Sequence, residues 1–147
     1  MRDLHGRSDG PPPPVDLAHE RAVGDFVRGL IRDGVATAVH DLSDGGLAVA
    51  VAEMAMASGI GASIDLPGGA DPVAVWFGED QGRYLVTIRD DTDLLRGIGD
   101  KARAGGFMAH HIGTTGGTEL KLAGARAISV AELETAHEAW FPGFMDS

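Results

Sequence analysis

The residues best placed for chemistry are His40, Asp41, Ser43 and Asp44, followed by the pair Gly45 and Gly46. They lie where an apolar, β-branched segment gives way to an alanine-rich one, which predicts the turn between a strand and a helix. Small residues there let a backbone approach a ligand closely, and the free N–H groups of a first helical turn attract anions. The turn is therefore a candidate ligand-binding site, with Asp41, Ser43, Asp44, Gly45 and Gly46 as the contacts.

The carboxylates of Asp41 and Asp44 complicate a phosphate site because they repel a bare anion. A magnesium ion or a nearby cation would have to intervene for phosphate to bind. The alternative is a plain tight turn in which Ser43 or Asp44 caps the following helix. His40 precedes two acids and has the chemistry of a base, but no serine or threonine nucleophile with a partner is evident, so no catalytic residue is assigned.

A second polar cluster, Glu79, Asp80, Gln81 and Arg83, directly precedes a segment of strong strand character. These groups can hydrogen-bond hydroxyl or amide groups, and Arg83 can hold a carboxylate or phosphate with two parallel bonds. An ordinary polar turn with Arg83 paired to a neighbouring acid is the favoured alternative. The glycine-rich segment 113–117 is either a backbone nest for an anion or a flexible hairpin turn.

The adjacent His110 and His111 are predicted to lie on a strand, where their side chains would point to opposite faces. Two side chains on opposite faces cannot jointly bind one metal without distortion. We therefore expect no zinc site, and no metal site is assigned to the chain.

The spacing of apolar residues, together with capping residues, glycines and prolines, predicts the helices and strands that position these residues. We expect helices over 16–33 (capped by Asp16 and stopped by Gly34), 46–58 (buried), 71–76, 90–104 and from Ser129 to near Pro142 and Gly143. Strands are expected over 35–39 (buried), 60–66, 84–88, 107–112 and 118–122, with a Pro-Gly-Gly turn after residue 66 and the last two strands forming a hairpin. The alternation predicts an α/β or α+β fold, a mixed β-sheet with flanking helices.

Composition narrows the class of protein. The 147 residues suit a single domain, and we expect a linker or tail over the proline-rich residues 1–14 followed by one α/β domain over 15–147. The formal charge of −10 disfavours nucleic acid as a partner. No apolar run is long enough to cross a bilayer and no signal sequence is evident, so we expect no membrane association and a cytoplasmic location.

Five segments in order carry a resemblance to a known family. HDLSDGGLAVAVAEMAMASG (40–59) strongly resembles the C-terminal domain of phosphoribosylformylglycinamidine synthase. LHGRSDGPPPPVDLAHERAVGDFVRGLI (4–31), FGEDQGRYLVTI (77–88), IGTTGG (112–117) and SVAELETAHEAWFPGFM (129–145) are similar to the same domain. The fold implied by the resemblance is that of the C-terminal domain of aminoimidazole ribonucleotide synthetase.

The resemblance implies a fragment of an ATP- and magnesium-dependent ligase. That enzyme converts formylglycinamide ribonucleotide and glutamine-derived ammonia to the amidine in purine biosynthesis. The implied partners are the preceding domains of the synthetase, a glutaminase subunit and a small bridging subunit. The family's nucleotide, magnesium and catalytic residues lie mainly in the preceding domains, so the fragment is expected to be inactive alone and to need no cofactor of its own.

Glu79, Asp80 and Gln81 are similar to a substrate-contacting Glu-Ser-Gln segment in the family's first half, but Asp80 departs from that pattern. They are therefore weaker candidates than the 41–46 turn. Two alternatives stay open: a non-catalytic ligand-binding or assembly module, and a related synthetase of the selenophosphate, hydrogenase-maturation or thiamine-phosphate type.

Overall fold

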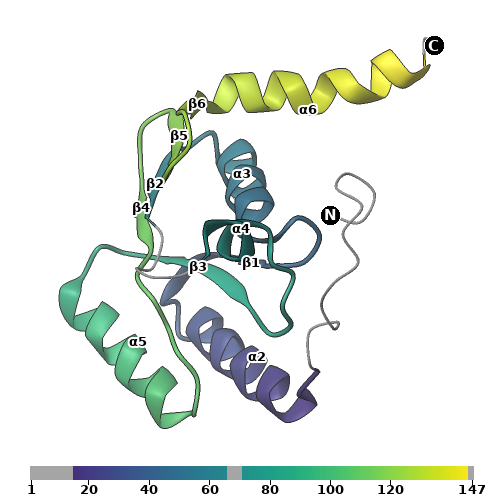
Figure 1. Cartoon of the computed structure of the whole chain (residues 1–147). Helices are drawn as coiled ribbons and strands as arrows, with labels where there is room; N and C mark the ends of the chain where they lie inside the picture. The colour runs from purple at the N-terminus through teal and green to yellow at the C-terminus, as the bar shows by residue number, and fades with distance from the viewer. Residues whose placement is uncertain (1–14, 66–70, 146–147) are drawn as a thin grey trace.

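The computed structural model describes residues 15–65 and 71–145 (Figure 1). The expected linker over 1–14 and the Pro-Gly-Gly turn lie outside the described residues. The helices are α2 (Leu17–Arg32), α3 (Gly46–Ser58), α4 (Pro72–Phe77), α5 (Thr92–Ala104) and α6 (Val130–Met145). The strands are β1 (Ala36–Asp41), β2 (Ala62–Ile64), β3 (Tyr84–Ile88), β4 (Gly113–Thr115), β5 (Glu119–Leu122) and β6 (Ile128–Ser129). No helix of this described part combines the length and the apolar character that crossing a bilayer requires.

Side-chain caps begin several of the predicted helices where the sequence places them. Asp16 accepts hydrogen bonds at 3.0 Å from the backbone N–H groups of residues 18 and 19 at the start of α2. Asp91 does the same for the N–H groups of residues 93 and 94 at the start of α5. Ser129 and Glu132 form a capping box at α6, in which each side chain accepts from the other residue's backbone N–H. These contacts satisfy backbone donors that have no partner within the helix.

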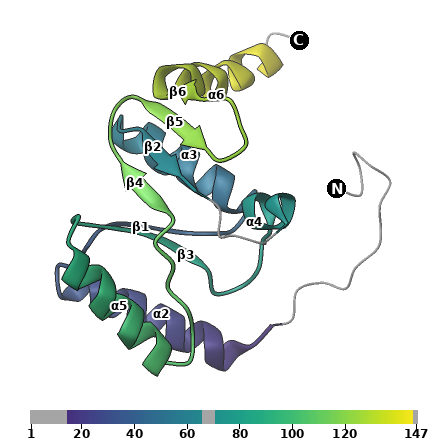
Figure 2. The same cartoon turned by 60° about the vertical axis from the view of Figure 1, so that its left-hand side comes forward.

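The strands form two sheets. In the first, β1 and β3 pair antiparallel as a two-stranded ribbon. In the second, the strand order is β4-β2-β5-β6, with β2 antiparallel to β4 and parallel to β5. The mixed sheet and the α/β class are confirmed, but β1 and β3 lie in a separate sheet (Figure 2).

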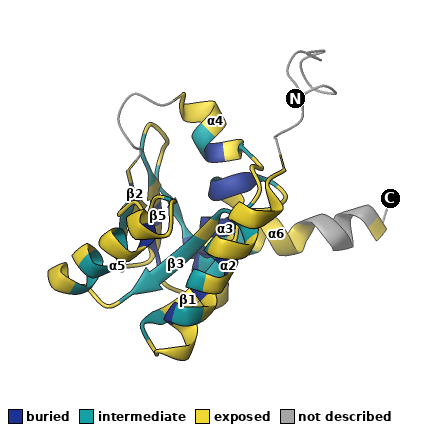
Figure 3. Cartoon of the chain, turned by 90° about the horizontal axis from the view of Figure 1, so that it is seen from below, coloured by how far each residue is buried: buried dark blue, intermediate teal, exposed yellow. Residues whose placement is uncertain are grey.

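The core forms where α3 packs between the four-stranded sheet and α4. Its buried side chains come from both sheet and helices, and they include Leu47, Val51, Ile64, Trp76 and Leu120. The buried stretch of α3 is confirmed, because Ala50, Val51 and Ala55 are each no more than 3% exposed. Figure 3 shows dark blue, buried segments on α3 and α4.

The predicted strand over 107–112 is wrong, and so is the hairpin it was to form. Phe107 instead packs edge-on against Phe26 of α2, with ring centroids 5.2 Å apart. The apolar residue that suggested a strand is thus used in helix packing, and the chain then crosses to the four-stranded sheet. Residues 113–115, expected in a loop, form β4, and β2 separates β4 from β5. The 113–117 segment is therefore not a hairpin turn, because β4 and β5 do not pair with each other.

The expected burial of the first strand is also wrong. β1 pairs with β3 alone within the described residues, and each of its residues is exposed or half-buried. Thr37 and Ala38 are exposed, and the Thr37 hydroxyl lies 2.7 Å from that of Thr87 across the ribbon. The mostly apolar segment correctly predicted a strand, but the strand is not buried.

Candidate functional site

The turn between β1 and α3 depends on two glycines. Gly45 has φ 83° and Gly46 φ 66°, in the left-handed region that favours glycine. A Cβ on Gly46 would lie 2.8–2.9 Å from the backbone of residues 76–78, so Gly46 also permits close packing of α3 on the end of α4. The predicted tight turn between a strand and a helix is confirmed.

The helix cap differs from the prediction. Neither Ser43 nor Asp44 caps α3; Gly45 is the capping residue and has no side chain to contribute. The Glu79 carboxylate instead accepts a 2.9 Å hydrogen bond from the Gly45 N–H. This contact joins the two polar clusters, which are separated by 34 residues in sequence, and places a negative charge at the positive end of the helix.

The second cluster is a turn stabilised by Arg83. The Arg83 guanidinium donates a 3.1 Å hydrogen bond to the Gly78 carbonyl and lies 3.6 Å from the Asp80 carboxylate. The expected pairing of Arg83 with a neighbouring acid is therefore confirmed. The Arg83 carbonyl accepts from the Leu42 N–H at 3.0 Å, which fixes this turn to the one after β1.

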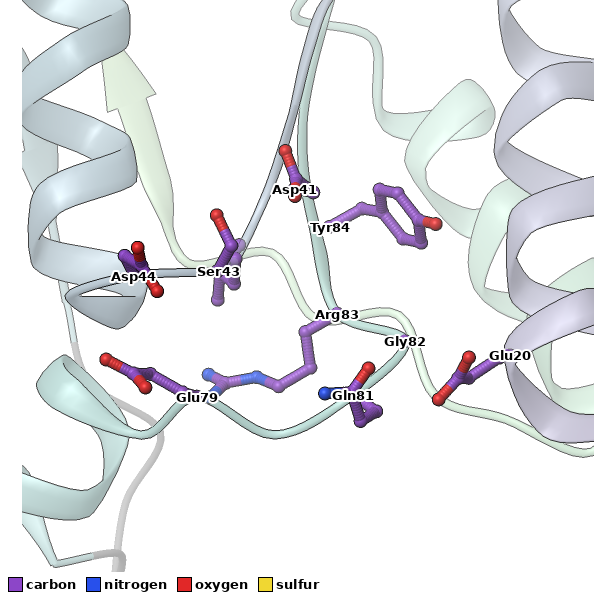
Figure 4. Close-up of a pocket in the computed structure, with 10 residues that line it drawn as sticks. Glu20, Asp41, Ser43, Asp44, Glu79, Gln81, Gly82, Arg83 and Tyr84 are labelled. Carbon is purple, nitrogen blue, oxygen red and sulfur yellow. The ribbon is translucent and has the colours of Figure 1, made fainter. Parts of the chain in front are cut away.

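Together the two turns and α2 enclose a cavity of about 270 Å³ (Figure 4). It is lined by Glu20, Asp41, Leu42, Ser43, Asp44, Glu79, Gln81, Gly82, Arg83 and Tyr84. Six of the nine sequence candidates lie there: Asp41, Ser43, Asp44, Glu79, Gln81 and Arg83. Gly45, Gly46 and Asp80 do not line it, and Gly46 is buried in the α3–α4 contact. Residues of both predicted clusters thus line one cavity.

Sequence reasoning missed Glu20 and Tyr84. Glu20 lies in the first turn of α2, far from either cluster in sequence, and its Oε1 atom is buried with no hydrogen-bond partner among the described residues. Tyr84 begins β3 immediately after Arg83, and its hydroxyl would lie 3.7 Å from a Cβ on Gly24 of α2. The position of Tyr84 next to the polar cluster was an available signal, whereas nothing in the sequence links Glu20 to the site.

The charge of the cavity determines what it can hold. Glu20, Asp41, Asp44 and Glu79 contribute four carboxyl groups, and Arg83 contributes one guanidinium. Carboxylates accept hydrogen bonds from hydroxyl, amide and ammonium donors and repel phosphate. The described residues therefore suit a polar, donor-rich ligand and do not fit the phosphates of a nucleotide, because Glu79 already occupies the N-terminus of α3.

Metal ligation finds no support in the parts of the chain that are described, where no group of three or more histidine, aspartate or glutamate side chains can hold an ion. His40 lies outside the cavity lining. Its Nε2 atom is 2.9 Å from the Glu53 carboxylate, and its Nδ1 atom is 2.6 Å from the Asp41 carbonyl oxygen. The contact with Glu53 links β1 to α3, whereas the contact with Asp41 lies within β1.

Comparison with known proteins assigns the family. Residues 1–123 match the family described as AIR synthase related protein, C-terminal domain. The chain belongs to this family. Solved structures support the same fold: PurLQS from Thermotoga maritima has a TM-score of 0.68 at 17% identity, over 81% of this chain and 22% of that chain. T. maritima PurL complexed with FGAR also has a TM-score of 0.68 at 17% identity, over 89% and 24%.

Closer relatives in sequence carry one name, phosphoribosylformylglycinamidine synthase subunit PurL. The protein from Sinorhizobium fredii (strain HH103) is 63% identical over 145 residues, or 99% of this chain and 19% of its own length. The protein from Chelativorans sp. (strain BNC1) is 64% identical over 148 residues, covering 99% and 20%. The chain therefore spans about a fifth of the length of the curated relatives it matches.

Proposed function

We propose that this chain is the C-terminal α/β domain of a phosphoribosylformylglycinamidine synthase and contributes to that reaction within a longer polypeptide. The observation that carries the proposal is 63% identity over 99% of the chain to a protein of that name. The reaction is the ATP-dependent conversion of formylglycinamide ribonucleotide to the amidine with ammonia from glutamine. The shared name of the close relatives favours this activity over the selenophosphate, hydrogenase-maturation and thiamine-phosphate alternatives.

Under this proposal, ATP and magnesium bind to the other domains of the longer polypeptide. Structures of T. maritima PurL complexed with ATP and with ADP resemble this fold, which supports nucleotide binding in the full-length protein. The cavity of this chain is rich in carboxylates, and the Gly45 N–H is already bonded to Glu79. ATP and magnesium are accordingly needed by the whole enzyme and not by this domain.

The proposed partners are the preceding domains of the synthetase, a glutaminase subunit and a small bridging subunit. The resemblance to PurLQS supports assembly with further subunits. Such an assembly would work in the cytoplasm, where the substrates of purine synthesis are available.

The cavity is the proposed ligand contact of this domain. Asp41, Ser43 and Asp44 line it together with Gln81 and Arg83, so hydroxyl and amide groups of a ligand would find both acceptors and donors. We propose that these residues position a polar part of a ligand and that bond-making groups come from the other domains.

Turnover measurements on two proteins test the division of labour. The longer polypeptide and the isolated 147-residue chain are each given formylglycinamide ribonucleotide, ATP, magnesium and ammonium, and ADP and amidine are measured. Turnover is expected only from the longer protein. Appreciable turnover by the isolated chain would overturn the proposal, as would a longer protein that binds and converts none of these substrates.

Substitution within the longer protein tests the cavity. Asp44→Asn and Arg83→Met alter groups that line it, whereas Asp80→Asn alters a charged group of the same loop that does not. Removing one hydrogen bond to a charged group typically costs about 1.5–3 kcal/mol, so KM for the ribonucleotide should rise about tenfold or more in the first two variants. Equal kinetics in all three variants would show that the cavity contacts no substrate.

A further inference from the structure

The outer side of α4 carries apolar side chains that the described fold leaves uncovered. Val73 is 45% exposed and Phe77 58% exposed, and their spacing of four residues places them on one side of the helix. Trp76, on the same helix, is only 7% exposed and belongs to the core. Figure 3 shows α4 with both a buried segment and exposed surface. The helix is therefore anchored by one residue and presents two others outward.

The neighbouring helix α3 carries one more exposed apolar side chain near its start. Gly46, the first residue of α3, packs on the backbone of residues 76–78, and Val49, one turn further along α3, is 37% exposed. Val49, Val73 and Phe77 are called the α4 face below. Asp71 caps α4, and Asp44, Glu79 and Asp80 are exposed in the adjoining turns. The α4 face thus combines apolar side chains with an acidic border.

We infer that the α4 face is a docking surface for another segment of the longer synthetase polypeptide, one that presents apolar side chains together with lysine or arginine. The inference rests on the proposed function, because it needs the polypeptide that makes up the other four fifths of the relatives' length. Apolar side chains on that segment would cover Phe77 and Val73, and its cations would complement the acidic border.

The size of the surface decides between a tethered segment and a second copy of the chain. Freely associating proteins usually bury about 800 Å² on each partner, which three side chains cannot supply. A segment of the same polypeptide needs a smaller contact, because a covalent connection raises its effective concentration to the order of millimolar. The limited extent of the α4 face therefore favours an occupant within the same polypeptide.

Hydrogen exchange tests the inference without relying on activity. Amide exchange over residues 72–77 is measured in the isolated chain and in the longer protein, and docking should slow it about tenfold or more in the longer protein. Phe77→Asp should restore fast exchange there. The control Met108→Asp changes a side chain that is 65% exposed and lies outside the α4 face, so exchange should stay slow.

The folding of the variants is checked on the isolated chain, where Phe77→Asp and Met108→Asp should leave the melting temperature nearly unchanged because both side chains are exposed. Equal exchange in the two proteins would overturn the inference, and so would slow exchange that Phe77→Asp does not relieve. A dimer of the isolated chain that Phe77→Asp dissociates would also overturn it in favour of a second copy. A longer protein with protected α4 amides but no synthase activity would defeat the proposed function and leave the docking surface standing.

Discussion

The contact between Glu79 and the Gly45 N–H can be tested as the cap of α3. Glu79→Ala removes the acceptor for this 2.9 Å bond and leaves the helix with no side-chain cap. Loss of a capping side chain typically costs about 1 kcal/mol, within a range of about 0.5–2 kcal/mol. Because Glu79 is exposed and lies near Asp44 in the cavity, we expect a loss of about 1 kcal/mol, or a drop of about 2–4 °C in melting temperature.

Two further variants separate hydrogen bonding from charge. Glu79→Gln keeps an oxygen acceptor but loses the interaction of the carboxylate with the helix dipole, so it should cost less, about 0.3–1 kcal/mol. Asp80→Ala breaks only a 3.6 Å surface ion pair and should change stability by less than about 0.5 kcal/mol.

Urea unfolding of the three variants, followed by tryptophan fluorescence, gives the free energies. Trp76 is buried at the base of α4 and should report the loss of the core. If Glu79→Ala were as stable as the parent chain, or if Asp80→Ala lost as much stability as Glu79→Ala, the capping argument would be refuted.

Three other substitutions extend these tests. Gly46→Ala should destabilise the chain by about 1 kcal/mol or more beyond Gly59→Ala in urea unfolding, because both glycines have φ 66° but only Gly46 would clash with backbone atoms. Leu120→Ala, at a side chain 2% exposed, should cost about 2–5 kcal/mol in the same measurement, and a loss below 1 kcal/mol would show that its site is not core. Hydrogen bonds from Ser129 lower the pKa of the Glu132 carboxyl, so its stabilising effect should be fully present above about pH 4.5 and disappear as pH falls through the lowered pKa. Ser129→Ala should remove that pH dependence of the melting temperature, and an unchanged pH profile would contradict the assignment.

Local signals in the sequence predicted local structure well. Asp16, Asp91 and Ser129 begin helices because their short side chains reach backbone donors two or three residues away. A strand within 60–66 is likewise confirmed, with Ala62 and Ile64 of β2 buried on either side of exposed Ser63. These outcomes depend on neighbours in the chain, which a single sequence displays directly.

Predictions that depended on distant contacts failed more often. The apolar residues of 107–112 suggested a strand, but Phe107 packs against Phe26 of α2, and the pairing of β2 with both β4 and β5 replaced the expected hairpin. The same limit explains the incomplete burial of β1, which depended on what would pack against the faces of its sheet. Hydrophobicity indicates that a residue will be covered without indicating by what.

The sequence alone determined the family resemblance, the α/β class and both polar clusters, because each depends on residues that are close together along the chain. Only the tertiary structure decided that the clusters form one cavity, that Glu79 caps α3 across 34 residues, and that Glu20 and Tyr84 complete the lining. The physical reason is that a ligand site is built from backbone turns brought together by packing: the close approach of Gly46 to the end of α4 sets where both turns lie. The sequence identifies the polar groups of the cavity, but the distances between them depend on the tertiary structure.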